Sequence, residues 1–192
     1  VDTCDLCSRL CKKRKVMSQQ NGNIYSKILF IAEAPGRLGA DCTGIPLYGD
    51  RTGYNFDKLL SNIGWTRDQI FITNAILCNP LDENVNNSTP TREEVSNCSY
   101  FLEMTIELVN PDVIVTLGAK ALEALALFRK HTYALKEHVG QRLDWNQHVL
   151  VPLYHTGPRA LIHRPFFKQT ADFITLSNFF DPIKGEKSRT PS

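Results

Sequence analysis

The chain has 192 residues, and its 22 Lys and Arg residues against 20 Asp and Glu residues give a formal net charge of +2. Hydrophobic residues make up 42% and charged residues 22%, a composition that excludes disordered, collagen-like and coiled-coil chains. The near-neutral charge excludes a protein that coats nucleic acid through bulk positive charge, but it is compatible with a local basic face. Because no apolar run reaches the length of about 20 residues that spans a membrane, and no signal-peptide core is present, we expect a cytoplasmic protein.

The length is that of one domain with a sizeable core. We expect this domain over residues 1–182, including an N-terminal segment that carries three cysteines and the basic run Lys12–Lys15. Residues 183–192 are rich in Lys, Ser, Thr and Pro, which predicts a flexible C-terminal tail.

Predicted strands and helices alternate after residue 23. In chain order they are a strand at 27–32, a helix at 55–63, a strand at 70–75, a long helix from Thr91, a strand at 112–117, a helix at 120–130, a strand at 149–154 and a closing helix at 165–180. Thr91 is expected to cap its helix, with Glu94 at the capping-box position. The alternation predicts an α/β fold with a central, mainly parallel four-stranded sheet and helices on both faces.

Unusual residues follow the ends of the predicted strands. They are Glu33–Gly36, Thr73–Asn74, Leu117–Gly118 and His155–Pro158. Ligands of open α/β sheets bind outside the carboxyl ends of the strands, so we expect a functional site at this edge.

A glycine-rich loop at residues 36–53 follows the first strand and matches neither a Walker A loop nor a G-x-G-x-x-G motif. Its backbone is suited to close approach by a ligand. Glu33 and Asp41 could orient a ligand or polarise a water, although Asp41 taken alone is more typical of a cap or turn acid. His155 begins a cationic segment with Arg159 and Arg164, which could contact phosphates or stabilise an anionic leaving group.

Four of the six cysteines have a spacing typical of a metal site: the close pair Cys4-x2-Cys7 and the distant thiols Cys78 and Cys98. Both iron–sulfur clusters and structural zinc use four thiolates, and the spacing alone does not separate them. The alternative is a set of free buried cysteines. Cys11 could replace Cys7 in the pair, and a sixth cysteine in the glycine-rich loop, Cys42, is expected to be a bystander.

Taken in order, these motifs resemble the iron–sulfur branch of the uracil-DNA glycosylase superfamily, often called family 4. That branch opens with C-x2-C, continues with G-E-(A/G)-P-G, an acidic residue and G-x-P-F-x-G-x-x-G, and then has T-N-x-x-K-C, P-T-x-x-E-(I/V) with a fourth cysteine, P-x-V-I-V-x-L-G and Y-H-P-S-P. The corresponding segments here are Cys4–Cys7, Ala32–Gly36, Asp41, Gly44–Gly53, Thr73–Cys78, Pro90–Cys98, Pro111–Gly118 and Tyr154–Pro158. Each motif is weak by itself, but the ordered set over about residues 4 to 180 is specific.

The resemblance implies a three-layer α/β/α sandwich that holds a [4Fe-4S] cluster on Cys4, Cys7, Cys78 and Cys98, and it thereby favours iron over zinc. It also implies a monofunctional glycosylase that acts on DNA, either duplex or single-stranded, and we expect a monomer. Such an enzyme flips a nucleotide out and hydrolyses its N-glycosidic bond. No lysine suited to a Schiff base stands in the motifs, which agrees with water as the nucleophile.

Site roles carry over by position. Asp41 matches the acid that orients the water, and His155 the residue that hydrogen-bonds the base carbonyl as charge develops on the ring. Glu33 and the following Ala34 would line the base pocket, and Asn74 would read the Watson–Crick edge. The resemblance further implies DNA contacts by Gly157, Pro158, Arg159 and Arg164.

Three positions depart from the family pattern. Leu47, with Tyr48 beside it, replaces the Phe that stacks on the flipped pyrimidine, Thr156-Gly157 replaces Pro-Ser after the histidine, and Ala32 replaces a glycine. Loss of a flat stacking face weakens a uracil pocket and could admit a bulkier base. The hypothesis is excision of a non-standard base, such as glucosylated hydroxymethylcytosine of phage DNA, in antiviral defence. The alternatives are ordinary uracil excision in repair, with Tyr48 as the stacking group, a DNA-binding or damage-sensing module without turnover, and an unrelated zinc-stabilised α/β protein.

Overall fold

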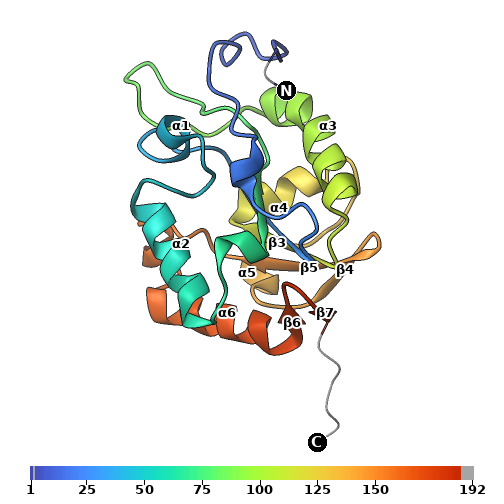
Figure 1. Cartoon of the computed structure of the whole chain (residues 1–192). Helices are drawn as coiled ribbons and strands as arrows, with labels where there is room; N and C mark the ends of the chain where they lie inside the picture. Colours follow the sequence, from blue (N-terminus) through green and yellow to red (C-terminus); the bar gives the residue numbers. More distant parts are fainter. Residues whose placement is uncertain (2, 187–192) are drawn as a thin grey trace, which may run out of the picture.

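The computed structural model describes residue 1 and residues 3–186. A five-stranded sheet lies at its centre with helices on both faces (Figure 1). The parallel strands are β1 (Ile28–Ala32), β2 (Phe71–Asn74), β3 (Val113–Leu117) and β5 (His148–Leu153). The order β2-β1-β3-β5-β4 ends on β4 (Leu143–Trp145), which runs antiparallel to β5. The predicted α/β/α architecture is confirmed, with one strand more than predicted, because β4 is too short to give a sequence pattern.

Each face of the sheet is covered by a pair of helices. Helices α2 (Arg51–Asn62) and α6 (Phe166–Phe179) cover one face, while α3 (Arg92–Val109) and α4 (Ala119–Leu125) cover the other. The smaller elements are α1 (Ala40–Thr43), α5 (Leu135–His138), the hairpin strands β6 (Phe180–Asp181) and β7 (Gly185–Glu186), and 3-10 turns at Gln19–Asn21, Arg67–Gln69 and Ala160–Ile162.

Strand β1 divides its side chains between the two cores, since successive side chains of a strand point to opposite faces. Phe30 packs on the side of α2 and α6, with its ring 5.3 Å from that of Phe56 and 6.1 Å from that of Phe173. Leu29 and Ile31 pack on the side of α3 and α4. Burial of each such side chain contributes roughly 1.5–3 kcal/mol, so the fully apolar β1 anchors the sheet.

Helix boundaries follow local caps. Helix α2 begins at Arg51, earlier than the predicted residue 55, because the Asp50 side chain accepts a hydrogen bond from the Gly53 N–H at 3.0 Å. The predicted capping box of α3 is confirmed, since the Glu94 N–H donates to the Thr91 hydroxyl and the Thr91 N–H donates to the Glu94 carboxylate. Helix α4 ends at Leu125, earlier than the predicted residue 130.

The C-terminal part of the chain is described only to residue 186. Residues 183–186 of the predicted tail include β7, which pairs with β6, and residues 187–192 lie outside the described residues. Among the helices described, none has the length and hydrophobicity needed to cross a membrane.

Candidate active site

A cavity of about 350 Å³, the polar cavity, opens at the carboxyl ends of the parallel strands. Its walls come from the segment after β1, the glycine-rich loop, residues 79–89 and the loop after β5. The residues that line it include Glu33, Ala34, Gly36, Leu47, Tyr48, Asp50, Asn79, Pro80, Asn87, Ser88, Thr89, His155 and Arg159. The sheet therefore forms a site at the edge that the sequence predicted.

His155 presents a defined tautomer to the polar cavity. Its Nδ1 accepts a hydrogen bond from the Gly157 N–H at 3.0 Å, so in the neutral ring the proton resides on Nε2, which is left as a donor. Burial lowers the pKa of His155 below its usual value, and the negative charge of Asp50 partly opposes this effect. A Cβ on Gly157 would lie 2.9 Å from Nδ1, so only glycine fits this turn. His155 is thus held as a neutral hydrogen-bond donor.

Glu33 directly follows β1 and is half-buried in the wall of the polar cavity. Burial raises its pKa, an effect that Lys120 opposes and Glu123 reinforces. Ala34 lies beside it in the same wall. The predicted pair therefore sits at the cavity, and its carboxyl group binds a proton more readily than an exposed glutamate.

Asp50 is a second cavity carboxylate, and it was not among the predicted site residues. Its Oδ1 caps α2 through Gly53, while a Cβ built on Gly39 would lie only 2.7 Å from its Oδ2. A Cβ built on Gly36 would lie 3.2 Å from the same Oδ2 atom, so Gly36 also approaches the carboxylate closely. The glycine-rich loop therefore wraps closely around this carboxylate. An aspartate directly before a helix was the available signal, but it is shared with many helix caps.

Asp41, the predicted catalytic acid, lies on α1 behind the cavity wall. Its Oδ2 accepts a hydrogen bond from Asn79 Nδ2 at 3.2 Å, and Asn79 lines the polar cavity whereas Asp41 does not. Asn74, the predicted base-reading residue, ends β2 and is 2% exposed. Its Nδ2 has no hydrogen-bond partner within the described part of the chain, and Asn74 is not among the residues that line the polar cavity.

Leu47 and Tyr48, at the predicted stacking position, both line the polar cavity. Leu47 has a φ of +50°, a left-handed conformation that costs a leucine on the order of 1–2 kcal/mol. Arg67 holds this segment, because it donates to the carbonyl oxygens of Pro46 and Leu47 and lies 5.5 Å from the Tyr48 ring centroid. This part of the wall is therefore aliphatic at Leu47 and aromatic at Tyr48, and Arg67 holds both residues.

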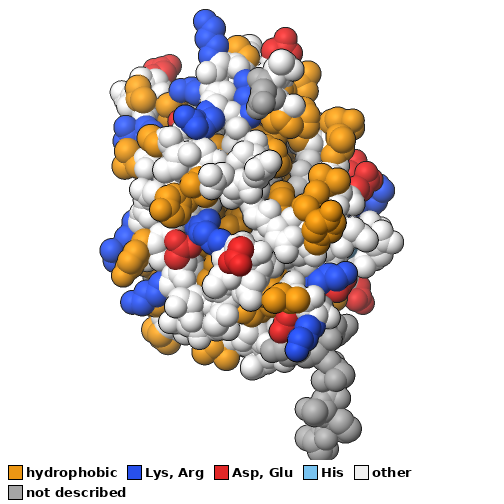
Figure 2. All heavy atoms as spheres, in the orientation of Figure 1, with side chains coloured by type: hydrophobic (Ala, Val, Ile, Leu, Met, Phe, Trp, Pro, Cys, Tyr) orange, Lys and Arg blue, Asp and Glu red, His pale blue; other side chains and the backbone are white. Residues whose placement is uncertain are grey.

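The loop after β5 carries the predicted DNA contacts. Pro158 and Arg159 are exposed, Gly157 is buried, and Arg159 reaches the polar cavity. Arg164 instead pairs with the buried Asp172 of α6, with its Nε 2.9 Å from Oδ2 and its Nη2 on Oδ1. The charge of Arg164 therefore anchors the loop. Arg159 is the cation among the residues that line the polar cavity. Figure 2 shows Lys and Arg side chains spread over one face of the molecule.

Five cysteines line a second, narrow cavity of about 20 Å³, the thiol cavity. They are Cys4, Cys7, Cys11, Cys78 and Cys98. Leu6, Leu10 and Ile76 complete its apolar wall. Among the residues that the structure describes, no group of three or more His, Cys, Asp or Glu side chains is arranged to hold one metal ion. A [4Fe-4S] cluster makes a different demand, because it is held by four cysteine thiolates rather than a single convergent ion site.

The donor set of the thiol cavity fits such a cluster. Burial, reinforced by the neighbouring thiols of Cys4 and Cys7, raises the pKa of both Cys78 and Cys98 to about 11. Cys11 is not among the groups that shift these pKa values, and its thiol donates to the Ser8 carbonyl at 3.3 Å. The Leu77 N–H donates to Cys98 Sγ at 3.4 Å, a contact of the kind that tunes cluster sulfurs. Cys4 and Cys7 therefore act on the pKa values of Cys78 and Cys98, whereas Cys11 lines the same cavity without this effect.

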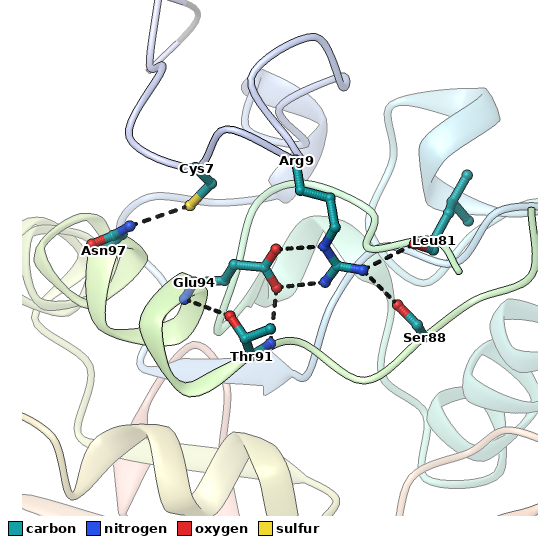
Figure 3. A network of polar contacts seen from close by, with 7 residues as sticks. All are labelled: Cys7, Arg9, Leu81, Ser88, Thr91, Glu94 and Asn97. Atoms are coloured by element: carbon teal, nitrogen blue, oxygen red, sulfur yellow. Dashed lines mark hydrogen bonds and ion pairs between the residues drawn. The ribbon is translucent and has the colours of Figure 1, made fainter. Parts of the chain in front are cut away.

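Arg9 joins the thiol cavity to the wall of the polar cavity (Figure 3). It binds Glu94 bidentately, with Nε 2.8 Å from Oε1 and Nη2 2.7 Å from Oε2, and these bonds lower the pKa of Glu94. Its Nη1 donates to the Leu81 carbonyl and to the Ser88 hydroxyl. Because Ser88 lines the polar cavity and Cys7 lies two positions before Arg9, one guanidinium connects both sites.

A model of the Uracil DNA glycosylase superfamily matches residues 19–176. The chain belongs to this superfamily. It is 35% identical over 156 residues to a Type-4 uracil-DNA glycosylase of Thermotoga maritima, which covers 81% of this chain and 77% of the relative. A Type-4 uracil-DNA glycosylase of Saccharolobus solfataricus is 32% identical over 215 residues, covering 100% and 94%, and one of Pyrobaculum aerophilum is 33% identical over 196 residues, covering 96% and 95%.

Membership in the superfamily confirms the predicted family and enzyme class: the chain is a DNA glycosylase, which hydrolyses an N-glycosidic bond. Type-4, the class that these relatives' names give, corresponds to the branch that the sequence motifs resemble. Within this superfamily fold, the cavity residues that sequence reasoning missed are Asp50, Asn79, Asn87, Ser88 and Thr89. The last four lie in a polar loop between predicted elements, where no periodicity marks the side chains that face a ligand.

Proposed function

We propose that the chain is a monofunctional glycosylase that takes a flipped pyrimidine into the polar cavity and releases it by hydrolysis, with a base larger than uracil as its preferred substrate. The observation that carries the proposal is the aliphatic wall at Leu47 in a cavity of about 350 Å³. A flat aromatic face at this place would add on the order of 1–3 kcal/mol of stacking to an unmodified base. Leu47 offers no such face, and the neighbouring Tyr48 ring already has Arg67 against it, which favours a substrate that gains affinity through other contacts.

The chemistry follows from the groups around the cavity. His155 Nε2 would donate to the base carbonyl and stabilise the negative charge that develops on the leaving ring. A carboxylate would orient the water and offset the positive charge on the sugar, and both Asp41 and Asp50 are candidates. Arg159, with the neighbouring Gly157 and Pro158, would bind the DNA backbone beside the opening.

The four thiols Cys4, Cys7, Cys78 and Cys98 would hold a [4Fe-4S] cluster. Bound there, the cluster supplies a covalent cross-link between the N-terminal segment and the sheet rather than hydrolytic chemistry. Arg9 and Glu94 would connect that segment to the Leu81 carbonyl and to Ser88, which lines the polar cavity.

The test is a panel of duplexes that contain uracil, 5-hydroxymethylcytosine, glucosylated 5-hydroxymethylcytosine or hypoxanthine. After incubation, alkali cleaves any abasic site. We expect strand breaks with a modified pyrimidine to exceed those with uracil. Preference for the glucosylated base would support a role in defence against phage DNA. Equal or greater cleavage at uracil would favour ordinary repair, the activity that the names of the Type-4 relatives state. Strand breaks on no substrate would leave a DNA-binding module.

A matched variant sharpens this test. Leu47→Phe restores an aromatic ring and reduces the free volume, so we expect it to improve cleavage of uracil DNA by about 5- to 50-fold and to weaken cleavage of the bulkier base. Tyr48→Phe serves as the control, since it keeps the ring beside Arg67. A wild-type preference for uracil that Leu47→Phe leaves unchanged would contradict the proposed role of this wall.

A further inference from the structure

Asn79 is a fully buried polar residue in the wall of the polar cavity. It follows Cys78, has no exposed surface, and lies beside Pro80 in that wall. The sequence motifs gave it no role. Its Oδ1 has no hydrogen-bond partner within the described residues. Nearly all buried polar atoms of native proteins are hydrogen-bonded, so this acceptor is left for a water or for a ligand in the cavity.

The orientation of the Asn79 amide is fixed by Asp41. The amide approaches Asp41 Oδ2 at 3.2 Å, and an ionised carboxylate can only accept hydrogen bonds. Nδ2 must therefore face Asp41, and Oδ1 is the end that remains for a ligand. Reversal of the amide would place two oxygen atoms against each other. The wall consequently offers an acceptor at this point and cannot offer a donor while Asp41 is ionised.

From these contacts we infer that Asn79 Oδ1 accepts a hydrogen bond from a donor group on the flipped base. Asp41 holds the Asn79 amide in the orientation that this hydrogen bond requires. The inference rests on the proposed function, because it takes the polar cavity as the base pocket. Pyrimidines present such a donor in two ways, the N3–H of a uracil-type base and the 4-amino group of a cytosine-type base.

The experiment measures binding, so that it does not depend on turnover. Duplexes carry 2′-fluoroarabino nucleotides of uracil, cytosine or 2-pyrimidinone, each with and without a 5-hydroxymethyl group. The fluorine disfavours positive charge on the sugar and prevents hydrolysis, and 2-pyrimidinone has no donor on its base-pairing edge. Wild-type protein, Asn79→Ala and Asp41→Asn are compared, with iron content and unfolding temperature as checks on folding.

We expect the wild-type protein to bind a donor-bearing base at least about tenfold more tightly than the matching 2-pyrimidinone. The preferred base, uracil-type or cytosine-type, identifies the donor as N3–H or the 4-amino group. Asn79→Ala should abolish the preference, and Asp41→Asn should reduce it, because an amide at position 41 lets Asn79 reverse. Equal wild-type binding of all bases, or a preference that survives Asn79→Ala, would overturn the inference. Selective binding without cleavage of any natural substrate would instead preserve it and remove the proposed hydrolysis.

Discussion

The thiol cavity is narrow and has an apolar wall, whereas the polar cavity is wide and lined by charged and amide groups, with volumes of about 20 and 350 Å³. Polar groups beside the thiol cavity have partners inside the protein: Glu94 accepts hydrogen bonds from Arg9 and from the Thr91 N–H. In the polar cavity, Asn79 Oδ1 has no hydrogen-bond partner among the described residues, and the contact of His155 Nδ1 with the Gly157 N–H makes Nε2 the donor of the neutral ring. Buried groups that are hydrogen-bonded within the protein make the structure around them rigid. Buried groups without such partners favour the binding of a ligand that can be exchanged.

Among tests of the contrast between the thiol cavity and the polar cavity, the largest effect is expected from substitution of one of the four cysteines proposed to hold the cluster. Cys98→Ser replaces a soft thiolate donor by a hydroxyl, so we expect loss of nearly all bound iron, loss of the brown absorbance and an unfolding temperature lower by several degrees. The matched control is Cys11→Ser, because the Cys11 thiol already donates to the Ser8 carbonyl and should leave the iron content unchanged. Zinc in place of iron, or iron lost from Cys11→Ser alone, would contradict the assignment.

A smaller effect is expected where the two cavities meet, at Arg9. Arg9→Ala leaves the buried Glu94 carboxylate with fewer donors, and because the Arg9 side chain is 39% exposed we expect a loss of only about 1–2 kcal/mol in the free energy of unfolding. Residues 80–89 should exchange amide hydrogens faster, and KM should rise by a few-fold more than kcat falls.

Arg9→Lys provides the control for charge. A lysine keeps the positive charge but cannot form the fork that reaches Glu94, Leu81 and Ser88 together, so it should behave more like Arg9→Ala than like the wild-type protein. Full rescue by lysine would mean that charge alone matters. Unchanged exchange at residues 80–89 in both variants would disprove the connection between the cavities.

The parallel strands were predictable from sequence because each depends on a local pattern, and the close cysteine pair Cys4 and Cys7 is a local pattern of the same kind. Runs such as residues 27–32 are buried on both faces and therefore almost wholly apolar, and C-x2-C spacing is visible without a fold. The role of Asp50 depends on how the glycine-rich loop folds back so that Gly36 and Gly39 approach its carboxylate, and that of Asn79 depends on Asp41 across the wall. Arg164 was predicted to contact DNA, but it pairs with Asp172. That pairing depends on how α6 packs, which the sequence does not show.

The smallest expected effect is a shift of the pH profile of kcat/KM on loss of the Asp50 charge, measured apart from any loss of maximal rate that follows if Asp50 orients the water. Protonation of His155 would place an N–H on Nδ1 against the Gly157 N–H, so activity should fall where the imidazolium forms. Burial already lowers the pKa of His155, and the Asp50 carboxylate raises it by favouring the charged ring. Asp50→Asn removes this charge but still caps α2, so the acid limb should move to lower pH. Asp41→Asn is the control, because Asp41 is not among the groups that shift the pKa of His155. It should lower the rate without moving the limb. A limb that stays in place in Asp50→Asn, or that moves equally in both variants, would show that the charge of Asp50 does not act on His155.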